Sequence, residues 1–285
     1  MIRVDSIEAL REVRHQWRLE NKRVGFVPTM GNLHNGHLSL LNKARENAEK
    51  TICSIYVNPL QFDRPGDLSN YPRTLEEDIA KLEEIGADMV FCPTDEHIYP
   101  RGMEHATTVD VPGITNVLDG AHRPGHFVGV ATVVCKLFNM VQPHLAVFGE
   151  KDFQQLLVVR RMTADLNLPV EIIGAPTARE PHGLAMSSRN NNLTDQEREH
   201  GGWLYKTLRA GADLVRQGQD FRAIEAEQER KLTELGFEPD YYSIRRTLDL
   251  EPARAGDDIA DLIILVAAQC GKARLIDNLP LSSHQ

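Results

Sequence analysis

Short apolar runs along this chain alternate with longer stretches in which apolar residues recur every three or four positions. The runs predict buried β-strands at residues 24–27, 52–57, 88–92, 145–148 and 170–173. The helical spacing predicts helices over residues 6–19, 38–44, 74–86, 129–141 and 153–166. Strands that alternate with helices indicate an α/β fold whose parallel sheet is joined by right-handed crossovers.

The alternation of strands and helices is interrupted in two places. Residues 93–128 are rich in proline and glycine, and a long irregular insertion of this kind is usually a functional loop or an elaborated edge. The composition changes again at residues 175–190. Beyond that point the pattern predicts two amphipathic helices and three short strands, at residues 194–217, 221–236, 241–245, 262–268 and 273–276. We therefore expect two domains, residues 1–177 with the parallel sheet and residues 178–285 as a smaller α+β domain.

The charge and the cysteines of the chain limit the classes of protein to which it can belong. There are 32 Lys and Arg against 41 Asp and Glu, a formal charge of −9, which disfavours general nucleic-acid binding but permits a local basic pocket. Four scattered cysteines without a C-x-x-C pair indicate reduced thiols rather than disulfides or zinc. The N-terminus lacks a signal-peptide core, and the longest strongly apolar run, residues 262–268, falls short of the roughly 20 that a membrane helix needs. We expect a cytoplasmic protein with no nucleic-acid or membrane partner.

The stretch from Pro28 to His37 forms the junction between the first long strand and its helix. Gly31 and Gly36 let the backbone come close to a ligand, and a helix N-terminus offers free N–H groups to anions. His34 and His37 are three residues apart, which predicts that both lie on one face of the first helical turn. The junction therefore predicts a phosphate site suited to nucleotide chemistry.

Two further polar groups follow predicted strands. Asn58 and Gln61 come after the strand at 52–57, and Lys151 and Asp152 come after the strand at 145–148. Because ligands gather beyond the carboxyl ends of parallel strands, we expect these side chains and the two histidines to share one site.

Simpler interpretations of the histidines remain open from the residues alone. The G-x-x-x-x-G-K-[ST] and G-x-G-x-x-G signatures are absent, so neither a P-loop nor a dinucleotide fingerprint applies. An isolated H-x-x-H pair is more often structural, but its setting with Thr29, Gly31 and Gly36 favours function. A zinc site would need a third ligand; His122 and His126 are available, although nothing in their spacing demands it.

The H-x-G-H element resembles the superfamily of class I aminoacyl-tRNA synthetases and nucleotidylyltransferases. Further collinear blocks, over nearly the whole chain, resemble the pantothenate synthetase (pantoate–β-alanine ligase) family. These blocks are Val27–His37, Val57–Phe62, Tyr71–Thr74, Arg123–Phe127, Phe148–Gln155 and Gly183–Asn190. The resemblance implies ATP-dependent condensation of pantoate with β-alanine through a pantoyl-adenylate, with release of AMP and pyrophosphate. It also implies Mg²⁺ on the ATP phosphates with unassigned protein ligands, a Rossmann-like N-terminal domain, a C-terminal lid and a cytoplasmic homodimer.

The resemblance also assigns site residues. It implies catalytic roles for His34, His37, Lys151 and Arg189. The implied ATP-binding positions are Met30, Gly31, His34, Gly36, His37, Gly149, Glu150, Lys151, Asp152, Ala178, Met186, Ser187, Ser188 and Arg189. Those for pantoate and β-alanine are Asn58, Gln61 and Gln155. A carboxylate that attacks the α-phosphate builds negative charge around phosphorus, so fixed donors and cations suit this chemistry. The adenylate itself activates the acyl group, and therefore no covalent nucleophile is needed.

Three positions depart from the family pattern. Asn35 stands where an acidic residue is common, Asp119 where glutamate is usual, and His182 where aspartate is expected, beside the Ser187–Arg189 phosphate clamp. Two rival functions also remain: a nucleotidylyltransferase that acts on a phosphorylated acceptor, and a non-catalytic nucleotide-binding protein. A tRNA synthetase fits less well because the chain is short, acidic and without an evident anticodon module.

Overall fold

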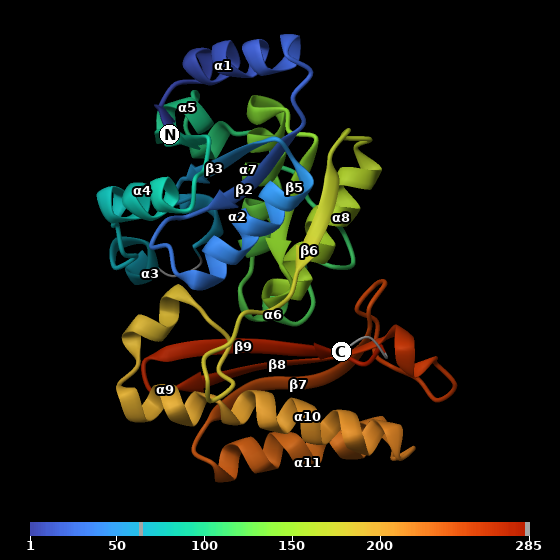
Figure 1. The fold of residues 1–285 in the computed structure, drawn as a ribbon. Coiled ribbons are helices and arrows are strands. Elements are labelled where there is room, and N and C mark those ends of the chain that lie inside the picture. The colour runs from blue at the N-terminus through green and yellow to red at the C-terminus, as the bar shows by residue number, and fades with distance from the viewer. Residues whose placement is uncertain (63–64, 283–285) are drawn as a thin grey trace. The chain divides into compact units, whose positions relative to one another are not determined.

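The computed structural model describes residues 1–62 and 65–282 and divides into two compact units (Figure 1). The first unit contains Met1–Asn116, Arg123–Glu150 and Gln155–Pro176. The second contains Val117–His122, Lys151–Gln154 and the described residues from Thr177 onward. Among the described residues, no helix combines the length and the apolar character needed to cross a bilayer.

A six-stranded parallel sheet forms the centre of the first unit, in the order β1-β4-β3-β2-β5-β6. Its strands are β1 (Ile2–Val4), β2 (Val24–Thr29), β3 (Lys50–Ile55), β4 (Met89–Phe91), β5 (Leu145–Gly149) and β6 (Glu171–Ala175). The strand order reverses between β2 and β5, which is the Rossmann arrangement with its ligand-binding switch point. The predicted α/β class is therefore confirmed. The sequence pattern missed β1, because three residues at a sheet edge are too short to show a period.

Helices cover both faces of this sheet. They are α1 (Ile7–Leu19), α2 (Asn35–Asn47), α3 (Pro65–Ser69), α4 (Leu75–Glu84), α5 (Asp95–Ile98), α7 (His126–Val141) and α8 (Phe153–Asp165). Phe26 and Phe148 pack edge-on against Phe138 of α7 on one face. The opposite face packs against α2 and α4, where Leu41 and Leu82 are fully buried. The strands are thus buried on both sides, as their continuous apolar runs predict.

Helix α7 approaches very closely a 3₁₀ turn, η1 (Pro59–Gln61), that follows β3. The contact is made by Gly129: a Cβ built there would lie 2.4 Å from the Leu60 carbonyl oxygen and 2.8 Å from the Gln61 amide nitrogen. The Gly129 carbonyl also accepts a hydrogen bond from Asn58 Nδ2 at 3.1 Å. Glycine at this position therefore sets how near η1 lies to the helix.

The second unit is built on a three-stranded antiparallel sheet, ordered β7-β8-β9. Its elements are α6 (Asp119–His122), η4 (Ser188–Asn192), α9 (Asp195–Gly201), α10 (Trp203–Arg216), α11 (Phe221–Glu234), β7 (Glu238–Arg246), η5 (Ile259–Asp261), β8 (Leu262–Cys270) and β9 (Ala273–Pro280). Helices α10 and α11 lie side by side against the sheet (Figure 1). The smaller α+β domain predicted from the sequence has this architecture.

The helix predicted over residues 194–217 is wrong in one respect, because it is broken into α9 and α10 at Gly202. A Cβ on Gly202 would lie 2.3 Å from the carbonyl oxygen of His182. Gly202 therefore allows close backbone packing at the break with a segment distant in sequence, a contact that helical periodicity does not report.

Two short segments that lie within the expected domain 1–177, Val117–His122 and Lys151–Gln154, belong to the second unit. Gln154 joins them: its Nε2 donates to the Val117 carbonyl at 2.8 Å, and its Oε1 accepts the Asp119 N–H at 3.2 Å. Asn278 of β9 donates to the Lys151 carbonyl at 2.8 Å. These long-range hydrogen bonds, rather than any local pattern, attach both segments to the β7-β8-β9 sheet.

Replacing Gly129 with alanine is expected to lower the free energy of unfolding by about 1–3 kcal/mol, the usual cost of overpacking, because the new methyl group would overlap the backbone of η1. Urea unfolding would measure the change. Gly66→Ala is the matched control, since the nearest atom to its Cβ is 4.0 Å away, and it should leave the midpoint unchanged or slightly higher. Equal midpoints for the two variants would contradict the packing argument.

Candidate active site

Three polar segments follow the carboxyl ends of adjacent parallel strands. Met30 follows β2, Asn58 follows β3, and Glu150 follows β5, and these strands are neighbours in the order β3-β2-β5. This edge contains the switch point at which doubly wound sheets bind ligands. The geometry of each segment then determines what it can offer a ligand.

The turn between β2 and α2 is held by two side chains of α4. Asp78 is fully buried, and its carboxylate accepts the N–H groups of Asn32 at 2.8 Å and Leu33 at 2.7 Å. Lys81, one helical turn later, donates to the Leu33 carbonyl at 2.8 Å. The turn includes two left-handed residues, Gly31 with φ of 78° and Asn32 with φ of 51°. Sequence reasoning missed this clamp, since an acidic first turn is already explained by the helix dipole.

The predicted free backbone donors at the start of α2 are already used within the protein. Gly36 N–H donates to Nδ1 of His34, and the N–H groups of His37 and Leu38 both donate to the His34 carbonyl. Earlier in the turn, Gly31 N–H donates to the hydroxyl of Thr29 at 3.2 Å. The prediction of free N–H groups is therefore wrong for these positions, because the turn satisfies its own donors.

The two histidines of the junction lie side by side, with ring centroids 4.1 Å apart. His34 is the N-cap of α2, and its Nδ1 accepts Gly36 N–H at 3.1 Å, while Nδ1 of His37 accepts the N–H of His34 at 3.4 Å. A ring whose Nδ1 accepts a hydrogen bond carries its hydrogen on Nε2. Each imidazole can thus offer an Nε2–H donor to a phosphate oxygen.

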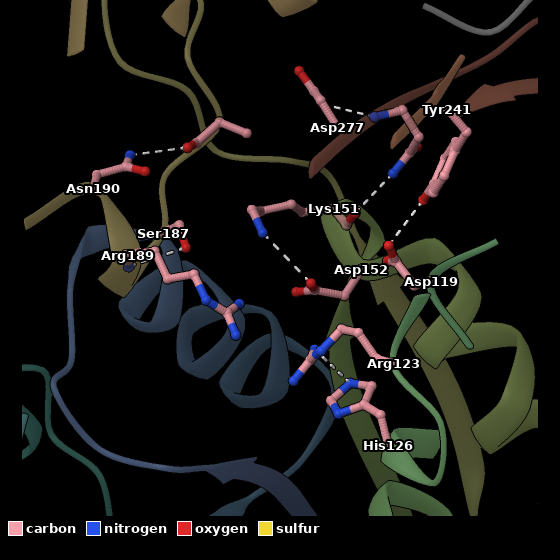
Figure 2. Close-up of polar contacts among 12 residues, drawn as sticks. Asp119, Arg123, His126, Lys151, Asp152, Ser187, Arg189, Asn190, Tyr241 and Asp277 are labelled. Atoms are coloured by element: carbon pink, nitrogen blue, oxygen red, sulfur yellow. Dashed lines mark hydrogen bonds and ion pairs between the residues drawn. The ribbon is translucent and has the colours of Figure 1, made fainter. Parts of the chain in front are cut away.

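Asn58 and Gln61 meet beyond β3, as their spacing suggests. Both are buried, and Asn58 Nδ2 donates to Gln61 Oε1 at 3.1 Å. Gln61 Nε2 donates to the Met30 sulfur at 3.0 Å, which joins the segments after β2 and β3. The Gln61 carbonyl accepts from Nδ1 of His126 at 2.7 Å, and Arg123 lies against the other ring nitrogen of His126 at 3.2 Å (Figure 2).

The zinc alternative finds no support in these contacts. His126 is engaged with Gln61 and Arg123, and His122 lies against the ring of Tyr241, with centroids 5.9 Å apart. Within residues 1–62 and 65–282, no group of three or more His, Cys, Asp or Glu side chains is arranged to hold a metal ion.

The two adjacent glutamines at the start of α8 have different environments. Gln155 is half-buried, whereas Gln154 is buried and joins Val117 to Asp119. Sequence reasoning named only Gln155, because the family motif points to it. The structural role of Gln154 depends on residues 35–37 positions away, which no short pattern reveals.

Lys151 and Asp152 follow Gly149 and Glu150 directly. Nζ of Lys151 lies 3.4 Å from Oδ1 of Asp152 (Figure 2). The Lys151 side chain is only 15% exposed. The Lys151 main chain is held by Asn278, as described above. Next to Asn278, Asp277 is buried and paired with Arg179 at 2.6 and 3.0 Å; burial raises the pKa of this carboxyl, while Arg179 opposes the rise. Lys151 is therefore a cation on a well-anchored backbone.

Residues 178–189 form a hairpin that leads into η4. Met186 N–H donates to the Ala178 carbonyl at 2.9 Å, and Arg179 forms a bridge with Ala185. Ser187 caps η4 by accepting the N–H of Arg189 at 3.3 Å, and the Arg189 side chain is exposed (Figure 2). The predicted phosphate clamp is therefore a structured turn with an accessible guanidinium.

The three departures from the family pattern differ in their setting. Asn35 is exposed at the start of α2. Asp119 lies in an ion pair with Arg274 at 2.6 Å. It also accepts the Tyr241 hydroxyl at 3.0 Å, as Figure 2 shows. Burial and this carboxylate raise the pKa of Tyr241 well above its ordinary value. Asp119 therefore attaches the segment Val117–His122 to strands β7 and β9.

His182 lies in the hairpin, with Nε2 3.6 Å from Oε2 of Glu180. The other oxygen of Glu180 accepts from Asn190 Nδ2 at 3.1 Å. His182 is thus linked through Glu180 to η4, the turn that contains Arg189.

The cysteine thiols are unsuited to nucleophilic chemistry. Burial raises the pKa of Cys53 to about 12 and that of Cys92 to about 11, so both remain protonated near neutral pH. Burial also raises the pKa of Cys135 and Cys270. These residues belong to the packing of the protein rather than to its chemistry.

The sequence and the structure of this chain are both similar to those of known proteins. The sequence model of the Pantoate-beta-alanine ligase family matches residues 3–280. Pantothenate synthetase of Thioalkalivibrio sulfidiphilus is 52% identical over 279 residues, which cover 98% of this chain and 97% of that protein. The pantothenate synthetase structure from Thermus thermophilus superposes with a TM-score of 0.90 at 45% identity, covering 99% of each chain.

A second solved structure adds bound ligands. Pantoate-beta-alanine ligase from Francisella tularensis, described as complexed with beta-gamma ATP and beta-alanine, is 36% identical with a TM-score of 0.83. It covers 99% of this chain and 98% of its own. With matches of this length and identity, the chain belongs to the pantoate–β-alanine ligase family.

Proposed function

We propose that this protein condenses pantoate with β-alanine in an ATP-dependent reaction that releases AMP and pyrophosphate. The observation that carries the proposal is the family match over residues 3–280, within which His34, His37, Lys151 and Arg189 are all present. The Francisella relative, described as complexed with beta-gamma ATP and beta-alanine, supports ATP and β-alanine as ligands here.

In the first step, the pantoate carboxylate attacks the α-phosphorus of ATP, a pantoyl-adenylate forms and pyrophosphate leaves. The Nε2–H donors of His34 and His37 hydrogen-bond phosphate oxygens and stabilise the charge that grows there. We assign Lys151 to the phosphates as a compact cation and Arg189 to a second phosphate contact. The remaining ATP-binding positions named from the family complete the nucleotide site around these groups.

In the second step, the β-alanine amine attacks the acyl carbon of the adenylate and AMP leaves. Gln61 and Gln155 hold pantoate through neutral amides, which bind its oxygens without drawing charge from the attacking carboxylate as an arginine would. Asn58, the third position named for this substrate, is buried and supports Gln61 from behind through its hydrogen bond to Gln61 Oε1. No enzyme nucleophile takes part, which agrees with four cysteines whose pKa is raised.

Three finer features complete the proposal. Phosphate and water oxygens, which Mg²⁺ prefers, would hold the ion that accompanies ATP, and Asp152 beside Lys151 would offer it a carboxylate oxygen. When bound, the ion neutralises phosphate charge. We further propose that the second unit acts as a lid and that the protein is a cytoplasmic homodimer, as the family resemblance implies.

Pyrophosphate release in the presence of ATP and Mg²⁺ tests the function, with pantoate and β-alanine added separately and together. We expect sustained release only with both substrates, alongside AMP and pantothenate, and at most a stoichiometric burst with pantoate alone. Release that ignores β-alanine and requires a phosphorylated acceptor would favour a nucleotidylyltransferase. ATP binding without turnover in any mixture would indicate a non-catalytic protein.

His37→Ala should slow adenylation by about a hundredfold or more, the scale for losing a positioned donor, while the fold stays intact. Single-turnover pyrophosphate release measures the rate, and circular dichroism checks the fold. The control is His15→Ala, which removes an exposed imidazole from α1. A single-turnover rate equal to that of the control would remove His37 from the mechanism.

Lys151→Ala should weaken ATP binding and slow adenylation by about a hundredfold, because the phosphates lose a cation in a poorly hydrated position. Titration calorimetry with ATP and single-turnover kinetics separate the two effects. Lys43→Ala, which removes a part-exposed lysine from α2, serves as the control. If Lys151→Ala slowed only the β-alanine step, its assignment to the phosphates would be wrong.

A further inference from the structure

The Asn58 side chain is completely enclosed by three partners in the first unit. It is 1% exposed, and its Oδ1 lies 2.7 Å from the hydroxyl of Tyr99. Its Nδ2 lies 3.1 Å from the Gly129 carbonyl and 3.1 Å from Oε1 of Gln61. Tyr99 is 4% exposed and follows α5 within the irregular insertion at 93–128. The insertion thus contributes a buried hydroxyl to the amides beyond β3.

The chemistry of these partners determines the orientation of the Asn58 amide. A backbone carbonyl only accepts hydrogen bonds, so the Gly129 oxygen requires the Asn58 nitrogen on its side. The Asn58 oxygen then faces Tyr99, whose hydroxyl donates. Burial, followed by the nearby Asp95 carboxylate, raises the pKa of Tyr99 above its ordinary value, so the hydroxyl keeps its proton.

The orientation of the Asn58 amide in turn determines that of the Gln61 amide. The two hydrogens of Asn58 Nδ2 go to the Gly129 carbonyl and to Gln61 Oε1, so the oxygen of the Gln61 amide faces Asn58. Gln61 Nε2 is then on the other side, where it lies 3.0 Å from the weakly accepting sulfur of Met30. The Gln61 amide can therefore offer a ligand an N–H donor and not a carbonyl acceptor.

We propose that Tyr99 is a positioning residue for the pantoate subsite, acting through Asn58 to hold the Gln61 amide with its N–H donors toward an acceptor oxygen of the hydroxy acid. The inference rests on the proposed function. A glutamine free to flip would spend part of its time with its oxygen toward the substrate carboxylate or hydroxyl oxygen, which lowers affinity. The hydrogen bonds from Tyr99 to Asn58 and from Asn58 to Gln61, here called the relay, remove that alternative before pantoate binds.

Tyr99→Phe removes only the hydroxyl and tests the relay. We expect the KM for pantoate to rise about tenfold, the scale for one buried hydrogen bond, with kcat and the KM for ATP changed less than twofold. A merely structural role would move all three parameters or none of them. Steady-state kinetics with each substrate varied in turn separates these cases.

Tyr56→Phe is the matched control. Tyr56 is 7% exposed, and its hydroxyl donates at 2.8 Å to Asp95, the first residue of the same short helix that Tyr99 follows. Loss of this hydrogen bond disturbs α5 without touching Asn58, so the KM for pantoate should equal that of the unmodified protein. A similar rise in both variants would overturn the inference, since the effect would then come from α5 and not from the relay.

The outcomes also separate this inference from the proposed function. If the unmodified protein forms pantothenate and Tyr99→Phe matches it in KM for pantoate, the relay is wrong and the function stands. If the unmodified protein binds ATP but does not use pantoate, the proposed function fails and the inference fails with it.

A measurement on the unmodified protein covers the case in which Tyr99→Phe does not fold. The Gln61 side-chain amide resonances are assigned by their loss in Gln61→Met, and pantoate is then titrated. We expect the two amide proton signals to shift at saturation, since a new acceptor meets Nε2. Unchanged signals at a pantoate concentration that supports turnover would overturn the inference.

Discussion

The carboxylate of Asp78 organises the turn on which the site depends. By accepting two consecutive backbone N–H groups, it compensates the burial of Asn32 and Leu33 and fixes a turn that includes left-handed residues. That turn delivers His34 to the N-cap of α2, and the cap in turn orients His37. A single buried charge on one helix therefore determines the geometry of two side chains on another.

Internal hydrogen bonds fix which atom each polar side chain offers to ligands. The Nδ1 atoms of His34 and His37 accept from the backbone, which leaves Nε2 as the donor, and Asn58 holds Gln61 so that its nitrogen is the outward atom. Phosphates and carboxylates are recognised by donors, so the protein has the orientation they need before they arrive. For the two histidines, the partner that fixes the donor atom is the backbone of the turn before α2.

The strands β2 to β6 and the histidine junction were predictable because local patterns report them: β-branched runs, helical spacing and two glycines beside a turn. The break at Gly202, the clamp by Asp78 and the orientation of Asn58 were not predictable. Each depends on an atom supplied from far along the chain, such as the His182 carbonyl against Gly202 or the Asn32 N–H bound by Asp78, 46 residues away. Periodicity and propensity describe neighbours in sequence, whereas these constraints arise only when the sheet brings distant segments together.

The buried thiols have a consequence for anyone designing covalent inhibitors. Burial raises the pKa of Cys53 to about 12 and that of Cys92 to about 11, so both thiols are almost entirely protonated at pH 7. Acrylamides and similar electrophiles react with the thiolate, so they have almost no target at either residue. Electrophiles of this class are therefore poorly matched to Cys53 and Cys92.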